Sequence, residues 1–235
     1  MAKTAVGDGI HTIVATPHTL NGVYINPVKE VTSRVTTLQE TLSKNHIPLN
    51  LHAGAEVHLC PHMVEHVENG DALTINNAGK YIMLEFPSHI VPSGVKDEIF
   101  SLKLNGITPI ICHPERNAVI QNNVDIMYTL VSMGALSLVT AMSITGGFWH
   151  VAQRAAEGLL SRRLVHMIAT DAHSTDSRPP LLSQAVEEAA EILGSIQEAE
   201  RMVNETPELI LSGNTIDIPE PLSERQAHEF LKKRL

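Results

Sequence analysis

Six histidine and carboxylate residues follow short apolar runs in this chain, and these residue types together are the usual ligands of zinc, manganese and iron. They are His18, Glu56, Glu85, His113, Asp171 and His173. A single histidine or carboxylate after a strand is more often structural, but six at equivalent places favour a shared metal site. Three carboxylates in one cleft would also repel one another unless cations or protons lie between them.

Two arginines follow members of this set. Arg116 comes after His113 in HPER, and Arg178 comes after Asp171 in DAHSTDSR. A guanidinium can hold a phosphate through paired hydrogen bonds. An isolated arginine is more often a surface residue, but the position of these two beside the candidate ligands favours a role in phosphate binding.

The elements that must position these residues can be read from the apolar runs. Buried strands are predicted at Thr12–Ala15, Leu49–Ala53, Tyr81–Leu84, Pro109–Cys112, Leu136–Thr140 and Val165–Ala169. Helices are predicted at Pro27–Lys44, Pro92–Leu104, Val124–Met133 and Phe148–Leu160, with closing helices after Leu181. This alternation predicts an α/β fold with a parallel sheet. The carboxyl ends of such strands meet at one mouth, where ligands bind.

The composition limits the classes of function. The chain has 235 residues, 43% of them apolar, and a net charge of −9. The negative charge and the lack of clustered Lys and Arg argue against nucleic-acid binding. No stretch approaches the ~18 apolar residues of a membrane helix, so we expect no membrane insertion and a cytoplasmic location. Two cysteines make no disulfide framework. We expect one domain over residues 1–235.

Other residues are expected to be structural. Cys112 precedes His113 but lies inside an apolar run, which favours inert packing over a nucleophile. Trp149 in GGFWH lies near the predicted mouth, and packing is the favoured interpretation. His166 has no matched neighbours and is also expected to be structural.

The order of motifs resembles a known superfamily. The segments GIHTIVATPHTLNGVY, GAEVH, YIMLEFP, PIICHPERN and IATDAHSTDSR together are similar to the polymerase-and-histidinol-phosphatase (PHP) superfamily. Within it, the chain most resembles the bacterial capsule-type, metal-dependent protein-tyrosine phosphatases. The resemblance extends from about residue 2 to about residue 218.

This resemblance implies a distorted (β/α)7 barrel with a cluster of divalent metal ions, usually manganese, with iron or zinc as alternatives. It implies that Glu56 bridges two ions, that Glu85 and His113 complete one site, that His18 and His173 serve another, and that Asp171 serves the remaining one. It also implies that Arg116 and Arg178 hold the substrate phosphate. The expected substrate is the phosphotyrosine tail of a bacterial tyrosine kinase that controls exopolysaccharide export. A homo-oligomer is left open.

The resemblance also raises an expectation about the start of the chain. Members of this family begin with a strand of the form Asp-x-His-x-His, whereas this chain starts inside the helix that follows that strand. We therefore expect the first strand, two histidine ligands and one aspartate ligand to be missing. Only Glu56, Glu85 and His113 would then form a complete ligand set.

Two alternatives follow from these residues. The chain could be another PHP phosphoesterase that prefers a small alkyl phosphate, such as a histidinol-phosphate phosphatase. It could also be a catalytically impaired remnant that keeps only the surface for its partner, because ligands are expected to be missing.

Overall fold

The computed structural model describes residues 1–227, and its centre is a set of parallel strands. These are β1 (Thr12–Ala15), β2 (His18–Thr19), β3 (Asn50–Ala53), β4 (Glu56–His58), β5 (Tyr81–Glu85), β6 (Thr108–Cys112), β7 (Leu136–Thr140) and β8 (Met167–Ala169). β1 pairs with β3, and the other six form a sheet in the order β2-β4-β5-β6-β7-β8. Every pairing is parallel, and the order follows the sequence, as it does in barrels.

The two sheets are continuous with each other. The amide of Gly54 donates to the carbonyl of Ala15 at 3.0 Å, and the amide of Glu56 donates to the carbonyl of Pro17 at 3.1 Å. A Cβ atom at Gly54 would lie 3.0 Å from Cγ1 of Val14, so the close approach of the β1 and β3 segments at this bend favours glycine. β1 and β2 are thus two halves of one bent strand, as are β3 and β4.

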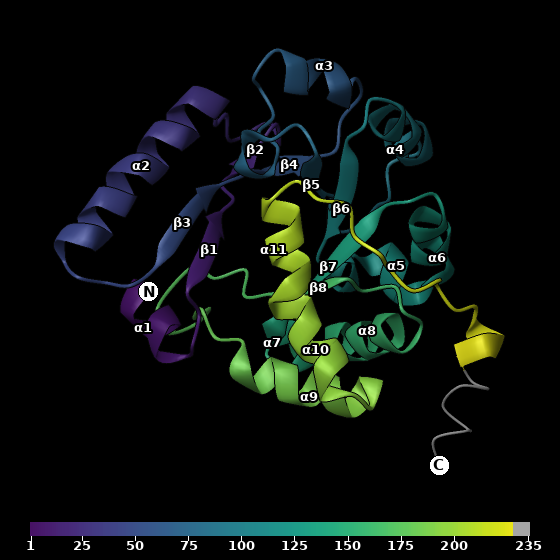
Figure 1. Cartoon of the computed structure of the whole chain (residues 1–235). Helices are drawn as coiled ribbons and strands as arrows, with labels where there is room; N and C mark the ends of the chain where they lie inside the picture. The colour runs from purple at the N-terminus through teal and green to yellow at the C-terminus, as the bar shows by residue number, and fades with distance from the viewer. Residues whose placement is uncertain (228–235) are drawn as a thin grey trace.

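Helices and short 3-10 turns connect the strands. They are α1 (Ala2–Gly7), α2 (Val28–Lys44), α3 (Met63–Glu68), η1 (Ile75–Asn77), α4 (Val95–Leu104), η2 (Pro114–Arg116), α5 (Ala118–Asn122), α6 (Asp125–Ser132), α7 (Ala141–Ile144), α8 (Trp149–Ser161), α9 (Ser183–Leu193), α10 (Ile196–Val203) and α11 (Glu205–Leu211). Figure 1 shows α2 beside β3 and β1, with α4, α5 and α6 on the other side of the strands. No helix in residues 1–227 is long and apolar enough to cross a membrane.

The predicted α/β fold with a parallel sheet is confirmed. The predicted strands and the four main helices are present, with bounds shifted by at most three residues, and helices follow Leu181 as expected. The sequence did not predict that β2 and β4 are separate strands, nor did it predict α3.

Two apolar clusters cover the two faces of the sheet. The larger one packs residues such as Ile82, Ile111 and Val139 against the surrounding helices. The smaller one packs Ile110 and Leu136 against Ile210 of α11 on the opposite face. Neighbouring residues of β6 belong to different clusters because successive side chains of a strand point to opposite faces. Figure 1 shows α11 lying across the strands on this second face.

Candidate functional site

The predicted ligands lie in or just after the parallel strands, and the strand register brings several of them together. His18 opens β2 and is the register partner of Glu56, which opens β4. Glu85 ends β5, and His113 directly follows β6. His18, Glu56, Glu85 and His113 form what we call the His–Glu cluster.

Distances within the His–Glu cluster are those of directly contacting polar groups. Nε2 of His113 lies 2.6 Å from Oε1 of Glu56 and 3.7 Å from Oε1 of Glu85. Nδ1 of His18 lies 3.2 Å from Oε2 of Glu85 and 3.4 Å from Oε2 of Glu56. Glu56 is only 5% exposed, so its charge needs close partners.

The donor set of this cluster fits a divalent cation. Nδ1 of His18 is buried and makes no hydrogen bond of acceptable geometry, although two carboxylate oxygens flank it. One atom each from His18, Glu56 and Glu85 can be chosen so that all three lie within 4.8 Å of one another. An unpartnered imidazole nitrogen between two carboxylates is the arrangement expected of ligands around a shared ion.

The electrostatics of the cluster reflect its crowded carboxylates. Burial alone would lower the pKa of His113, but the hydrogen bond to Glu56 reverses this effect and the pKa is raised. Contact with Glu85 likewise raises the pKa of His18. Burial would raise the pKa of Glu85, but contact with His18 lowers it. The carboxylates of this cluster therefore favour positive charge on the neighbouring imidazoles.

Asp171 and His173 lie in a second group, which we call the arginine cluster and which also contains Arg116 and Arg178. Nη1 of Arg116 donates to Oδ2 of Asp171 at 2.5 Å, and Nη2 of Arg178 donates to the same oxygen. Nδ1 of His173 lies 2.9 Å from the carbonyl oxygen of Asp171. Nε of Arg178 is buried without a hydrogen-bond partner, so this arginine has an unused donor.

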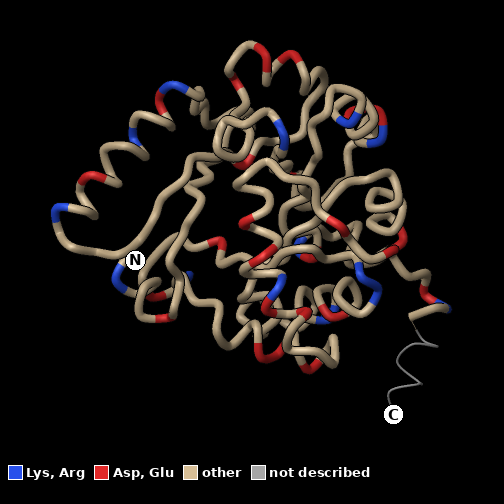
Figure 2. Tube along the Cα trace, viewed as in Figure 1, with Lys and Arg blue, Asp and Glu red and all other residues tan. Residues whose placement is uncertain are grey.

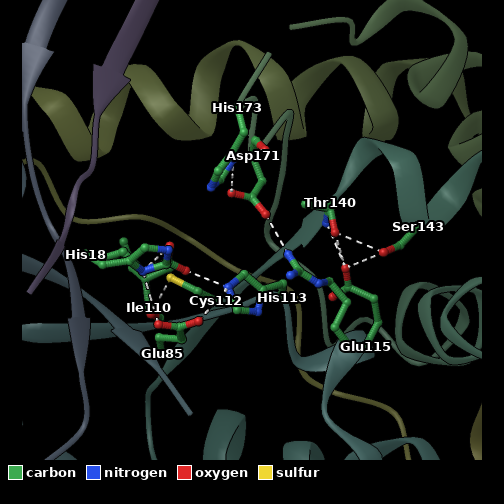
Figure 3. A network of polar contacts seen from close by, with 12 residues as sticks. His18, Glu85, Ile110, Cys112, His113, Glu115, Thr140, Ser143, Asp171 and His173 are labelled. Carbon is green, nitrogen blue, oxygen red and sulfur yellow. Dashed lines mark hydrogen bonds and ion pairs between the residues drawn. The ribbon is translucent and has the colours of Figure 1, made fainter. Parts of the chain in front are cut away.

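The two clusters adjoin each other but are not one ligand set. The imidazole rings of His18 and His173 are 6.3 Å apart between centroids. Figure 3 shows His18, Glu85 and His113 together, with Asp171 and His173 apart from them. The structure thus brings all eight predicted site residues to one region, and it pairs Asp171 with the arginines.

Backbone strain occurs in both clusters. His113 has φ 34° and Asp171 has φ 47°, each immediately or shortly after its strand. Residues other than glycine are uncommon at positive φ, and such strain gathers at functional sites. These two conformations turn the chain sharply at the ends of β6 and β8.

Two residues with contacts to the site were not singled out from the sequence. The ring of Phe148 lies 4.8 Å from the guanidinium carbon of Arg116 and 5.4 Å from that of Arg178. It therefore holds both arginines side by side through cation–π contact. The only sequence signal was its neighbour Trp149, which is 81% exposed. The expectation that Trp149 is a packing residue is wrong.

The second such residue is Glu115, which is fully buried. Its Oε1 accepts hydrogen bonds from the amide of Thr140 at 3.0 Å, from the hydroxyl of Thr140, and from the hydroxyl of Ser143 at 2.7 Å. Figure 3 shows these three side chains converging. Through these hydrogen bonds, Glu115 holds its own segment, which also contains His113 and Arg116, against the end of β7.

Cys112 is not suited to nucleophilic chemistry. It is buried, and burial raises the pKa of its thiol well above the ordinary value. The thiol therefore stays protonated near neutral pH. The expectation of a packing role agrees with this environment, as it does for His166, which is 5% exposed.

Outside the arginine cluster, the residues that the structure describes show no concentration of Lys and Arg. Figure 2 shows Lys and Arg scattered among Asp and Glu, and the two signs alternate along α2.

Comparisons with known proteins agree with one another. The model of a family described as "Capsular polysaccharide synthesis, CpsB/CapC" matches residues 1–212. Tyrosine-protein phosphatase YwqE of Bacillus subtilis is 35% identical over 232 residues, covering 98% of this chain and 90% of that protein. The putative tyrosine-protein phosphatase CapC of Staphylococcus aureus is 34% identical over 184 residues, covering 78% of this chain and 72% of that protein.

A solved structure is also similar to the described fold. It belongs to a study of YwqE from Bacillus subtilis and CpsB from Streptococcus pneumoniae, which that study calls unique metal-dependent tyrosine phosphatases. The TM-score is 0.89 at 34% identity, and the match covers 94% of this chain and 89% of that chain.

Proposed function

The chain belongs to the CpsB/CapC family of capsular polysaccharide synthesis proteins, and we therefore propose that it is a metal-dependent tyrosine phosphatase that acts as a single domain. The relatives named as tyrosine phosphatases support this activity, and they favour it over hydrolysis of a small alkyl phosphate. The observation that carries the proposal is the convergence of His18, Glu56 and Glu85, with one ligand atom of each within 4.8 Å of the others, near two arginines that can hold a phosphate. We further propose a PHP-type (β/α)7 barrel.

The His–Glu cluster is proposed to hold the metal. His18, Glu56, Glu85 and His113 offer two imidazole nitrogens and four carboxylate oxygens, a donor set suited to manganese, with iron or zinc as alternatives. When bound, a divalent ion supplies positive charge for the phosphoryl oxygens and activates water as the nucleophile. Asp171 and His173 are proposed as additional ligands.

Arg116 and Arg178 are proposed to orient the phosphoryl group. Both guanidinium groups now bind Asp171, so a phosphate that takes their donors replaces one anion with another. The unused Nε of Arg178 offers one more donor. Exchange of partners would leave the Asp171 carboxylate free to serve as a ligand. Tyrosine is a fair leaving group, with a pKa of about 10, so strong acid catalysis is less essential.

The physiological substrate is proposed to be the phosphotyrosine tail of a bacterial tyrosine kinase that controls capsule export. The capsular polysaccharide role of the family supports this partner class. A cytoplasmic location is proposed with it, since the kinase tail would have to be reached there.

The test is hydrolysis of a phosphotyrosyl peptide by the 235-residue chain after chelation, with and without added manganese. We expect metal-dependent turnover that Glu56→Gln reduces by ~100-fold or more, while Glu65→Gln, an exposed glutamate of α3, has little effect. Alkylation of the cysteines should leave activity largely intact.

Metal binding should be followed separately by calorimetry. Protons compete with the ion because the pKa values of His18 and His113 are raised above 6.5, so manganese affinity should weaken as the pH falls through those raised values. Turnover without metal, or complete loss of activity on alkylation, would refute the proposed mechanism. Peptide binding without turnover would instead support the catalytically impaired remnant.

A further inference from the structure

Three loops around the proposed active site carry exposed apolar side chains. Val23, Tyr24 and Ile25 follow β2, Ile90 follows β5, and Trp149 is the first residue of α8, directly after the loop that follows α7. We call these five residues the apolar rim. They make up five of the twelve large apolar residues that are exposed in residues 1–227, although the three loops are short.

Short contacts connect each loop to the proposed site. The ring of Tyr24 stacks on that of His18, with centroids 6.4 Å apart and an interplanar angle of 20°. The carbonyl oxygen of Ile90 accepts a hydrogen bond from Nδ2 of Asn117 at 2.9 Å, and Asn117 directly follows Arg116. Trp149 directly follows Phe148, whose ring lies against both arginines. Each of the three segments is therefore anchored beside a residue of the proposed site.

The loop after β2 is held in a fixed conformation. Oδ1 of Asn21 accepts hydrogen bonds from the amides of Val23 at 3.0 Å and Tyr24 at 2.8 Å. Nδ2 of Asn26 donates to the carbonyl of His18 at 2.7 Å. Internal bonds of this kind lower the entropy that a loop loses when it binds a partner.

The backbone conformation of Trp149 is strained, and burial of its side chain does not compensate for that strain. It has φ 68°, which is strained for a bulky residue, yet the residue is 81% exposed and gains little from burial. Gly146, three residues earlier, has φ 78°, a conformation that favours glycine and that permits the turn before Trp149. Strain that presents an apolar ring to solvent beside a site suggests a role in binding.

The absence of charged residues from these loops limits the kind of peptide that they can bind. Residues 20–27, 86–94 and 145–149 contain no Lys, Arg, Asp or Glu. An ion pair with acidic or basic residues around a phosphotyrosine is therefore not available in these loops. The net charge of −9 further disfavours an acidic peptide. Exposed aromatic and aliphatic side chains instead match uncharged apolar and aromatic residues.

We propose that the apolar rim binds the uncharged apolar and aromatic residues that flank the phosphotyrosine of a protein substrate. This inference rests on the proposed function, because it places the phosphate at Arg116 and Arg178. It adds a selection for peptide sequence that the metal and phosphate groups cannot provide. Trp149 and Ile90 contact the flanking residues, and the arginines hold the phosphate.

The first test uses the fluorescence of Trp149, which is the only tryptophan in the chain. Two peptides carry a non-hydrolysable phosphonate analogue of phosphotyrosine, one flanked by Phe and Ile and the other by Ser and Gly. We expect the first peptide to shift the emission to shorter wavelength, because it covers an exposed indole, and to bind at least tenfold more tightly. Equal affinities for the two peptides would overturn the proposal.

The second test compares Trp149→Ala with Phe100→Ala, which removes an aromatic residue that is 61% exposed on α4, outside the rim. We expect Trp149→Ala to lower kcat/KM at least tenfold more for the apolar phosphotyrosyl peptide than for p-nitrophenyl phosphate. Phe100→Ala should leave both values unchanged. Equal losses on the two substrates would overturn the proposal.

The two tests separate the possible failures. If no form of the protein hydrolyses either substrate, the proposed function fails, while the fluorescence titration still decides whether the rim selects apolar flanks. If both substrates are hydrolysed and flanking residues have no effect on affinity or kcat/KM, the proposed function stands and the rim proposal fails.

Discussion

Acid should destabilise this protein through His166, a buried residue away from the proposed active site. Burial lowers the pKa of His166 to about 4, and its Nδ1 accepts a hydrogen bond from the amide of Ser137 at 2.9 Å. A proton on Nδ1 would displace this bond and place a charge in a site that is 5% exposed. The folded protein therefore keeps His166 neutral until the pH approaches 4.

The size of the effect follows from the difference between the two states. The ordinary pKa of histidine is 6.5, so the unfolded chain takes up a proton at His166 about 2.5 pH units before the folded chain does. The free energy of unfolding thus falls by ~1.4 kcal/mol per unit as the pH drops from 6.5 towards 4, and by ~3 kcal/mol in total. Well above pH 6.5 the residue is neutral in both states and has no such effect.

The assay is urea denaturation of the metal-free protein at pH 7, 5.5 and 4.5, for the wild type and His166→Asn. Asparagine offers an amide oxygen near the position of Nδ1 but takes up no proton. The variant will differ in absolute stability, but only the change with pH matters. We expect the wild type to lose ~1.2 kcal/mol more than the variant between pH 7 and pH 5.5, and ~2.4 kcal/mol more between pH 7 and pH 4.5.

Other titrating groups are shared by the two proteins. His18 and His113, whose pKa values are raised, favour the folded state as the pH falls, whereas Asp8 and Glu85, whose pKa values are lowered, oppose it below their ordinary range. The difference between the two proteins cancels these contributions. Parallel loss of stability in both would refute the assignment of a low pKa to His166.

Two further substitutions test contacts around the site. In urea denaturation, Glu115→Ala should lower the free energy of unfolding by ~3 kcal/mol, because it leaves three buried donors without their acceptor. The exposed Glu187→Ala should change it by less than ~0.5 kcal/mol. A loss below ~1 kcal/mol for Glu115→Ala would contradict the role of Glu115 in holding its segment to β7. Phe148→Leu should raise KM for a phosphotyrosyl peptide ~5-fold with a smaller change in kcat, because it removes the ring that aligns Arg116 and Arg178. An unchanged KM would show that the arginines are positioned without it.

Much of the fold could be predicted from the sequence because the parallel strands are buried on both faces. β7, for example, is buried along its whole length and is apolar at most positions. The bend between β3 and β4 could not be predicted, since it depends on how closely Gly54 approaches Val14 from another strand. The same sequence run therefore looked like one strand followed by a loop.

The site could be predicted in part. The rule that carboxyl ends of parallel strands meet at one mouth was enough to bring His18, Glu85 and His113 together. It was not enough to predict the ion pair between Asp171 and Arg116, because that pair depends on distances and burial that exist only in the folded molecule. The contact of Phe148 with the two arginines could not be predicted, because an aromatic residue outside a regular element can equally well pack in the core or lie on the surface.

The sequence by itself determined the strand and helix order and the residue types at the strand ends, because hydrophobic periodicity and chain order are local properties. Only the tertiary structure decided which polar groups share partners. Glu115 and Thr140 are 25 residues apart, and Arg116 and Asp171 are 55 residues apart, yet each pair is in direct contact. It also decided that Trp149 is exposed, because exposure depends on what the rest of the chain leaves uncovered.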